Sequence, residues 1–427
     1  MKKLFFVLLV GALLLAACAP AAPAAPAEPA APAEPAAPAE PAAPAEPAAP
    51  AAAEGPAACQ SDAFGCAVIA KGATVKVGYA GPLAGDYAAY GQDQVNAMLL
   101  AIKDAGDIQG WTIEMVAEDD GASAEGGAAV ANKMVSDPNF VAIAGPAFSG
   151  DSSAAMPIFE KAGVPMMSPS ATNPELTAKG SKVFNRNAFT DADQAKAAAE
   201  YLSGTLGLKK LAIIHDGSDY GQGIANTVKE LFTAAGGEVV ATEAITPGEA
   251  DYSAPMAAIG AMKPEAIYFG GYNAEASVLV NQKKQAGLDN VIFFGGDGIF
   301  GTDFLTKAGK NGENAYSTTM VPPTSEARTK FDEAFKAAYG VEPGTITAYT
   351  WGSYDAMAAL LSVIKTVAVV ENDTLYIPRG ALVDAVRSLK DFTGVAGTIT
   401  CSETGECNAS GPIIYTVKDG AWTAVEK

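Results

Sequence analysis

The sequence predicts an α/β protein in which two mostly parallel sheets are each flanked by helices. From residue 75 onward, short runs rich in β-branched and aromatic residues alternate with Ala-rich amphipathic stretches. This alternation is typical of βαβ units, whose parallel sheets are covered by helices on both faces. Because a single sheet of roughly ten or more strands is unusual, the strands divide more naturally between two lobes.

The expected elements follow one another along the chain with few interruptions. Strands are expected at 75–79, 112–117, 141–144, 164–167, 182–184, 210–214, 238–244, 266–269 and 291–294. Helices are expected at 91–105, 125–137, 152–161, 221–235, 253–262, 274–286, 325–339 and 350–365. The first lobe gives way to the second near 187–191, where a strand is followed by a helix opened by Thr190 and Asp191.

The N-terminal residues are similar to a bacterial export signal. A short basic start is followed by an uncharged apolar run at 4–17, which is too short to span a bilayer. The run ends in Leu-Ala-Ala-Cys and resembles the lipobox of bacterial lipoproteins. The resemblance implies a lipoprotein signal peptide at 1–17, with Cys18 as the lipid anchor. The alternative is an ordinary signal peptide that is cut nearby, with Cys18 incidental.

Residues 18–57 form a Pro/Ala/Glu-rich linker with a recurring Ala-Glu-Pro-Ala-Ala-Pro hexad. Proline at every third position forbids a helix and favours polyproline II, and the segment has no side chains for a core. At roughly 3.1 Å per residue the linker would reach on the order of 100 Å. We expect a stalk that lifts the domain from the membrane; the alternative is a ligand for a proline-binding module.

The charge and the histidine count exclude several functions. The formal net charge is −20, and most of the acidity lies in the globular part, so the chain is not expected to bind nucleic acid. The one histidine, His215, rules out a zinc site of clustered histidines. A Ser-His-Asp triad would have to use His215.

The cysteines predict disulfides. If Cys18 is acylated, the other four form two close pairs, and an exported protein meets an oxidising compartment. Of three possible connectivities, Cys59–Cys66 with Cys401–Cys407 needs the least rearrangement of the chain. A four-cysteine metal site is the alternative, although the gaps are wide for a zinc knuckle. The second pair flanks a turn-like stretch between β-prone runs, which predicts a stapled hairpin.

Ligands of such sheets bind beyond the carboxyl ends of the strands, so the loops there carry the candidate site. The first-lobe loops supply the hydroxyls of Ser149 and Thr172 at or just before helix starts, where an anion is favoured. The second-lobe loops supply aromatic side chains and Asp297, flanked by glycines. A carboxylate-binding half facing an ammonium-binding half suits an α-amino acid. The alternative for each residue alone is a helix cap or a packing role.

Several motifs in these loops point to one family. They are Gly81-Pro82 with Tyr90-Gly91, the run Pro-Ser-Ala-Thr-Asn-Pro-Glu-Leu-Thr at 169–177, His215-Asp216 with Tyr220-Gly221-Gln222-Gly223, and Gly270-Gly271-Tyr272. From about residue 74 to the end, the chain resembles the periplasmic leucine/isoleucine/valine-binding proteins of ABC transporters, which have the type I solute-binding fold. The run at 169–177 is the most specific of these motifs.

The resemblance implies two lobes that close on a ligand by hinge bending. Lobe 1 would comprise 58–190 and 320–413, and lobe 2 would comprise 191–319 and 414–427. The chain would cross between the lobes near 187–191, 319–323 and 412–416. The Cys401–Cys407 segment departs from the family, which has a polar turn there, and is expected to be a staple without a ligand role.

The resemblance also implies roles for the candidate site residues. Ser149 and Thr172 would bind the ligand carboxylate, the Ser170 carbonyl would take the ammonium group, and Asp297 would be the acid that pairs with it. Asp297 is roughly 1.5 Å shorter than the glutamate common in close relatives. The remaining pocket residues would be Tyr90, Ala171, Tyr220 and Tyr272, with Tyr349 near the side-chain end.

The function implied is that of an extracytoplasmic substrate-binding lipoprotein of an ABC importer. It would bind an amino acid, branched-chain in the first place, and deliver it to the permease as a monomer without cofactor or metal. Alternatives on the same fold are binding or sensing of an amide, urea-like compound or aromatic acid, and a structural adhesin. A lipid-anchored hydrolase using His215 and Asp216 is the enzyme alternative, but phosphate-loop, dinucleotide and nucleophile-elbow motifs are absent after the predicted strands. We therefore expect no enzymatic activity.

Overall fold

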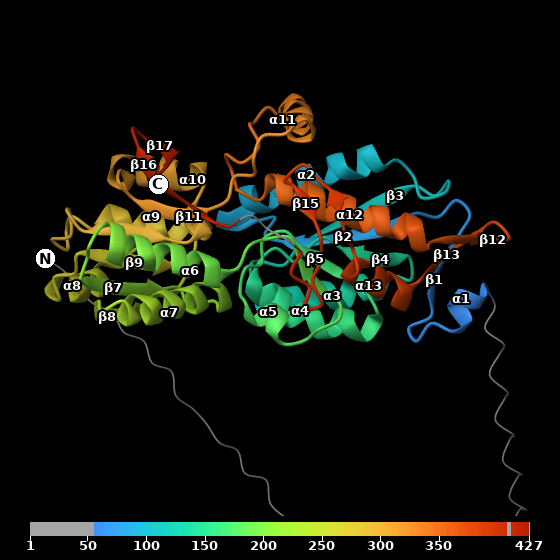
Figure 1. The fold of residues 1–427 in the computed structure, drawn as a ribbon, viewed down its shortest axis with the longest axis horizontal. Helices are drawn as coiled ribbons and strands as arrows, with labels where there is room; N and C mark the ends of the chain where they lie inside the picture. Colours follow the sequence, from blue (N-terminus) through green and yellow to red (C-terminus); the bar gives the residue numbers. More distant parts are fainter. Residues whose placement is uncertain (1–54, 408–410, 427) are drawn as a thin grey trace, which may run out of the picture. The chain divides into compact units, whose positions relative to one another are not determined.

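The computed structural model describes residues 55–407 and 411–426, which contain two large sheets flanked by helices (Figure 1). The expected signal peptide, the Cys18 anchor and nearly all of the linker lie outside the described residues. Among the described residues, no helix combines the length and the apolar character needed to cross a membrane. The expectation of an α/β protein with two sheets is confirmed.

The first sheet has five strands in the order β3-β2-β4-β5-β6, and all of its neighbouring strands are parallel. The strands are β2 (Val75–Gly81), β3 (Ile113–Asp119), β4 (Phe140–Ile143), β5 (Met166–Ser168) and β6 (Phe184–Arg186). The helices between them are η1 (Gly85–Tyr87), α2 (Ala88–Ala105), α3 (Ala124–Val135), α4 (Ser149–Ala162) and α5 (Glu175–Ala178).

The second sheet has seven strands in the order β17-β16-β11-β10-β9-β7-β8, with antiparallel pairing only at the β16 and β17 end. The strands are β7 (Lys210–His215), β8 (Glu238–Ala244), β9 (Ala266–Gly270), β10 (Ile292–Gly295), β11 (Tyr316–Thr319), β16 (Ile413–Lys418) and β17 (Ala421–Ala424). The associated helices are α6 (Asp191–Glu200), η2 (Tyr201–Thr205), α7 (Asp219–Ala234), α8 (Ser253–Ala261), α9 (Asn273–Gln282), η3 (Asp297–Ile299), α10 (Thr302–Ala308) and η4 (Gly309–Gly312).

The chain passes between the two sheets three times. It leaves the first sheet after β6 and enters α6, which begins at Asp191 with Thr190 as the N-cap of a capping box. It returns after β11 to α11 (Glu326–Tyr339) and α12 (Thr350–Val367), which pack against α2. It passes to the second sheet again before β16. The predicted helix start at Thr190 and Asp191 is confirmed.

Several elements, most of them short, were not predicted from the sequence. Beside the two large sheets and within them they are α5, α10, β11, β16 and β17. Elsewhere they are α1 (Ala57–Gln60), β1 (Cys66–Ala70), β12 (Val369–Glu371), β13 (Thr374–Pro378), α13 (Arg379–Arg387), β14 (Phe392–Thr393) and β15 (Thr398–Ile399). Strands β1, β13 and β12 form a small antiparallel sheet, and β14 pairs with β15.

The structure contains both disulfides, Cys59–Cys66 and Cys401–Cys407. The predicted hairpin at Cys401–Cys407 was wrong, because the strand before it, β15, pairs with β14, and the disulfide closes only a short turn in which Ser402 N–H donates to the Glu406 carbonyl. The outer edge of this turn pairs with β6, where Arg186 N–H donates to the Gly405 carbonyl (2.9 Å). The polar groups that a hairpin would pair internally are thus satisfied by a strand about 220 residues earlier in the chain.

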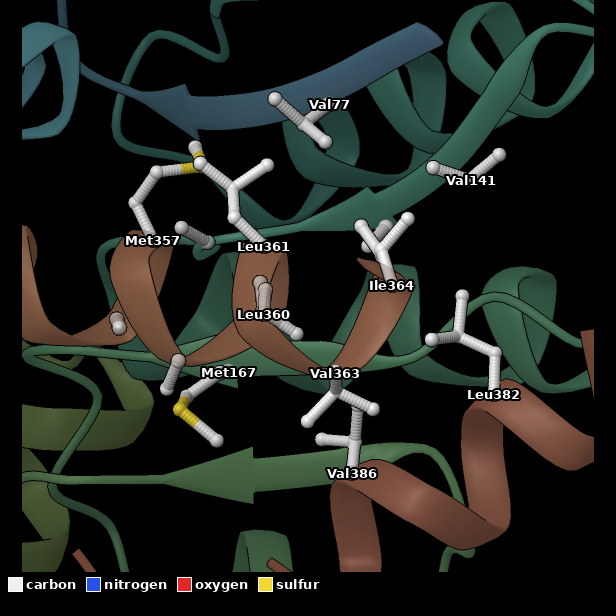
Figure 2. Close-up of a cluster of buried hydrophobic side chains, with 14 of the residues drawn as sticks. Val77, Val141, Met167, Met357, Leu360, Leu361, Val363, Ile364, Leu382 and Val386 are labelled. Carbon is white, nitrogen blue, oxygen red and sulfur yellow. The ribbon is translucent and has the colours of Figure 1, made fainter. Parts of the chain in front are cut away.

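Helix α12 is the centre of the first lobe's core. Figure 2 shows Leu361 and Ile364 of α12 facing Val77 and Val141 of the sheet. The opposite side of α12 meets α13, so apolar residues surround the helix, as is usual for a buried helix. The packing of this helix fixes the position of its N-terminal end, which reaches the candidate site.

Replacing Leu361 by alanine should therefore lower the free energy of unfolding by about 2–5 kcal/mol, because Leu361 is fully buried and leaves a cavity. Leu99 on the neighbouring helix α2 is 42% exposed and provides a control. Leu99→Ala should cost much less. Urea unfolding of both variants measures the difference, and equal losses would contradict the central place of α12.

Candidate functional site

Five aromatic rings form a continuous row between the loops of the two sheets. Ring centroids are 5.1 Å apart for Tyr220 and Tyr272, 4.5 Å for Tyr272 and Phe148, 5.2 Å for Phe148 and Tyr90, and 6.4 Å for Tyr90 and Tyr349. Each ring lies in the first turn of a helix or at its N-cap. The row joins loops of the second sheet to loops of the first, so the predicted tyrosines do converge.

Asp297, two residues after the end of β10, connects the two ends of this row. Its carboxylate accepts hydrogen bonds from the Tyr220 hydroxyl (2.9 Å), the Tyr349 hydroxyl (2.7 Å) and the Gln194 amide. The Gln194 carbonyl in turn accepts from Asp297 N–H (3.0 Å) and from the Thr318 hydroxyl (2.7 Å). These bonds fix both the carboxylate and the amide in one orientation.

Asp297 is an acidic residue that follows a strand, but it is buried. Its side chain is only 7% exposed, and burial raises its pKa, while the bonds from Tyr349, Gln194 and Tyr220 act in the opposite direction. Among the described residues no lysine or arginine forms an ion pair with it. Among the residues that the structure describes, Tyr349 alone donates to the oxygen Oδ2, which therefore has room for a second donor.

Ser149 and Thr172 lie on the first-sheet side of the site. Ser149 is the first residue of α4, and its hydroxyl oxygen accepts from Asn173 N–H (3.2 Å), so the two loops touch. Thr172 is buried three residues before the single turn α5, so only Ser149 lies at a helix start. The backbone amides that open α4 favour an anion at this position.

Ser170 and Ala171 belong to the same loop. The Ser170 hydroxyl donates to the Ala147 carbonyl (2.7 Å) and accepts from the Gln94 amide (3.0 Å). Ala171 N–H donates to the Ser168 hydroxyl oxygen (3.0 Å). The Ser170 side chain and backbone N–H, which donates to the Ser168 hydroxyl oxygen (3.4 Å), are thus engaged in holding the loop, so only the Ser170 carbonyl is considered for contact with a ligand.

Sequence reasoning missed several residues of the site. Phe148 lies in the loop after β4, so the rule that ligands bind beyond strand ends could have identified it. Gln194 lies inside helix α6, where neither its spacing nor its residue type indicates a role. Tyr87 and Glu275, which join the two sides of the site by a hydrogen bond of 2.8 Å, were also not predicted.

No hydrogen bond among the described residues joins the His215 and Asp216 side chains, as a general base and the acid that orients it would require. Among the described hydrogen bonds, His215 Nδ1 accepts from Gly217 N–H (3.2 Å), and Asp216 accepts from the Ser218 backbone and hydroxyl. Burial lowers the pKa of His215. These contacts fix the loop at the start of α7. Within the described ranges, no group of three or more His, Cys, Asp or Glu side chains is arranged to hold a metal ion.

The chain matches one protein family over most of its length. The family is described as "Periplasmic binding protein", and residues 74–421 match it. A Leu/Ile/Val-binding protein homolog from Brucella melitensis is 29% identical over 360 residues, which cover 83% of this chain and 94% of the relative. A leucine-, isoleucine-, valine-, threonine- and alanine-binding protein from Pseudomonas aeruginosa is 34% identical over 62% of this chain and 71% of its own.

Solved structures give the same result. The leucine-binding protein LivK from Thermotoga maritima is 28% identical with a TM-score of 0.75, covering 83% of this chain and 98% of its own. The branched-chain amino acid transporter substrate-binding protein LivJ from Streptococcus pneumoniae, in complex with isoleucine, is 31% identical with a TM-score of 0.72. That likeness covers 82% of this chain and 99% of the pneumococcal chain.

A buried carboxyl group beneath the aromatic row makes stability depend on pH. The Thr350 hydroxyl donates to Asp93 (2.6 Å), which connects the helix of Tyr90 to the helix that follows Tyr349. Burial raises the pKa of Asp93 to about 7, although the bond from Thr350 acts against the rise. The folded protein therefore holds this proton more tightly than the unfolded chain does.

The contribution of Asp93 to stability should be complete below its unfolded pKa of 3.8 and lost as the pH rises through about 7. Asp93→Asn should remove this loss, which is on the order of 4 kcal/mol at most. Urea unfolding between pH 4 and pH 8 measures the slope. Asp107→Asn, at an exposed position, should keep the wild-type profile; the same profile in Asp93→Asn would contradict the assignment.

Proposed function

The chain belongs to the periplasmic binding protein family, and from that premise we propose that it binds an amino acid between its two lobes and delivers it to the permease of an ABC importer. Branched-chain amino acids are the proposed ligands, since the similar proteins named above include binders of leucine, isoleucine and valine. Family membership implies an exported, extracytoplasmic protein. The amino acid would be bound and released without being chemically changed.

The observation that carries the proposal is the buried carboxylate of Asp297. Three donors orient it, and among the described residues no basic side chain forms an ion pair with it. A buried charge is costly unless it is paired, and the ammonium group of an amino acid would supply the missing cation. Oxygen Oδ2 can accept the additional hydrogen bond.

The other end of the ligand would meet the first-sheet loops. Ser149 at the start of α4 would donate its hydroxyl and backbone N–H to the ligand carboxylate, and Thr172 would do the same from the facing loop. The Ser170 carbonyl would share the ammonium group with Asp297. Ala171 would line the pocket between them.

The aromatic row would contact the ligand side chain. Tyr90, Tyr272 and Phe148 present ring surfaces that suit an apolar, branched side chain, and Tyr220 and Tyr349 use their hydroxyls on Asp297. Aspartate is shorter than the usual glutamate, and these two phenols support that shorter acid.

The organisation of the whole chain is proposed to match this role. Residues 58–190 with 320–413 form lobe 1, and residues 191–319 with 414–427 form lobe 2, so the three chain crossings are the hinge. Residues 1–17 would be removed as a signal peptide, Cys18 would carry the lipid, and the linker would hold a monomeric binding unit at the membrane.

Leucine, isoleucine or valine should raise the melting temperature of the protein in a thermal-shift screen. A ligand at a hundred times its dissociation constant should add about 2.7 kcal/mol to the free energy of unfolding. The screen should also contain the other amino acids, small amides, urea and benzoate as alternatives. A shift caused only by an amide or an aromatic acid would contradict amino-acid binding, and no shift with any compound would contradict capture of these ligand classes.

Asp297→Asn should weaken leucine binding by tenfold or more, because loss of a buried charged partner costs on the order of 2 kcal/mol or more. The control is Asp289→Asn, which removes the same charge from an exposed position of the same lobe. Isothermal titration with leucine measures both. An unchanged affinity of Asp297→Asn would show that Asp297 does not bind the ammonium group.

A further inference from the structure

The guanidinium of Arg186 is completely buried at the end of β6, and all five of its N–H donors have partners. Nε and Nη2 donate to the two carboxylate oxygens of Glu406 (2.9 and 2.6 Å), and Nη2 also donates to the Thr177 hydroxyl oxygen (3.0 Å). Nη1 donates to the carbonyls of Ala171 (3.1 Å) and Asn173 (2.7 Å). The group has no freedom left to move independently.

The two carbonyls that Arg186 holds are those on either side of Thr172. The Thr172 carbonyl itself accepts from Asp191 N–H (3.0 Å) at the start of α6. Three consecutive carbonyls are therefore fixed. The direction of the Thr172 backbone N–H follows from this fixation, because this N–H lies in the same peptide plane as the Ala171 carbonyl.

Glu406, which anchors Arg186, lies inside the loop closed by Cys401–Cys407. The Glu406 N–H donates to the Ser402 hydroxyl oxygen (3.2 Å), and its carbonyl accepts from Ser402 N–H (2.8 Å). Cys407 N–H donates to the Arg186 carbonyl (2.9 Å), so the loop also contacts the backbone of β6. The disulfide thus restricts the main chain on both sides of Glu406.

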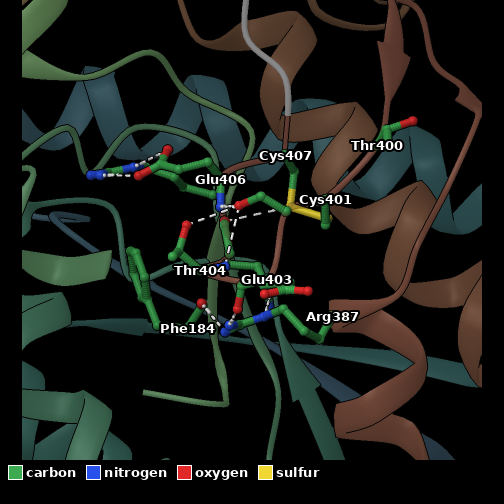
Figure 3. The surroundings of a disulfide bond; sticks show 12 residues. Phe184, Arg387, Thr400, Cys401, Glu403, Thr404, Glu406 and Cys407 are labelled. Carbon is green, nitrogen blue, oxygen red and sulfur yellow. Dashed lines mark hydrogen bonds and ion pairs between the residues drawn. A yellow bond between two sulfur atoms is a disulfide. The ribbon is translucent and has the colours of Figure 1, made fainter. Parts of the chain in front are cut away.

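A second arginine holds the other side of the same loop. Figure 3 shows Arg387 between Glu403 and Phe184, and its guanidinium donates to the carbonyls of both residues (2.7 Å each). Arg387 comes from α13, so this part of the loop is fixed to the first lobe independently of Arg186.

The charge on Glu406 is maintained by these contacts. Burial acts to raise its pKa, but the hydrogen bonds and charge of Arg186, with the Thr177 hydroxyl, outweigh burial and hold the pKa below its usual value. Glu406 is therefore an anion at neutral pH, and its pairing with Arg186 is a charge-assisted, two-pronged contact.

We propose that Glu406, held by the Cys401–Cys407 disulfide, is a positioning residue for ligand binding, which acts through Arg186 on the Thr172 loop. The inference rests on the proposed function, because that function assigns Thr172 to the ligand carboxylate. It gives the disulfide a role beyond stapling the chain. Removing the disulfide should release Glu406, loosen Arg186 and lower ligand affinity as well as stability.

The other disulfide, Cys59–Cys66, offers a matched control. Cys59–Cys66 joins α1 to β1 and has a sequence separation of 7, compared with 6 for Cys401–Cys407. Loops of nearly equal length lose similar chain entropy when they are closed, so removal of either disulfide should lower stability by similar amounts. A difference in ligand affinity between the two variants then reports positioning and not stability.

The experiment compares the double variants C401S/C407S and C59S/C66S with the wild type, by isothermal titration with leucine far below all melting temperatures. The dissociation constant should rise about fivefold or more in C401S/C407S, the lower range of coupling between sites. It should be unchanged in C59S/C66S. Unchanged affinity in C401S/C407S, or equal losses in both variants, would overturn the proposal.

A separate experiment on single variants of the loop does not depend on leucine. Glu406→Gln keeps the shape of the side chain but removes its charge, and Glu403→Gln is the control, since Glu403 contacts Arg387 only through its carbonyl. Hydrogen exchange of the ligand-free protein should become faster at residues 171–173 in Glu406→Gln alone. Identical exchange in the two variants would refute positioning, whereas failure of the wild type to bind leucine would refute only the proposed function.

Discussion

The arrangement of the candidate site depends on the burial of one carboxylate. Asp297 is withdrawn from water, and a buried acid without compensation would be strongly destabilising. The compensation comes from Tyr220 and Gln194 next to the second sheet and from Tyr349 at the start of α12, which packs on the first sheet. Satisfying this single group therefore requires elements of both lobes to come together.

The other contacts between the two sides follow the same pattern. Tyr87 donates to Glu275, and the Asn173 amide donates to the Asp219 carbonyl, both at 2.8 Å. The aromatic row adds apolar contact between the two sides, as in the stacking of Phe148 on Tyr272. Contacts of this kind are individually modest, so the proposed binding of one amino acid would be enough to bias an equilibrium between closed and open lobes.

Much of the fold was predictable because it depends on local pattern, whereas the site depends on pairs that are distant in sequence. The βαβ alternation located the strands up to 294, and the rule of strand ends located Tyr90, Tyr220, Tyr272 and Asp297, whereas Tyr349 came from the family resemblance. The partners of these residues left no local trace: Gln194 is 103 residues from Asp297, and Arg186 is 220 residues from Glu406. The predicted hairpin was wrong for the same reason, because its true partner is β6.

The same contrast separates two properties of the proposed binding groups: their position in the fold and the precision of their orientation. Topology alone brings Ser149, Thr172 and Asp297 to one edge of two sheets, since parallel strands end together. It does not orient a hydroxyl or a peptide N–H to within the few tenths of an ångström that a charged ligand requires. In this protein that orientation comes from buried groups with every donor used, Gln194 behind Asp297 and Arg186 behind Thr172. If these residues bind the ligand as proposed, a substitution of Gln194 or Arg186 would change how well the ligand fits without touching it.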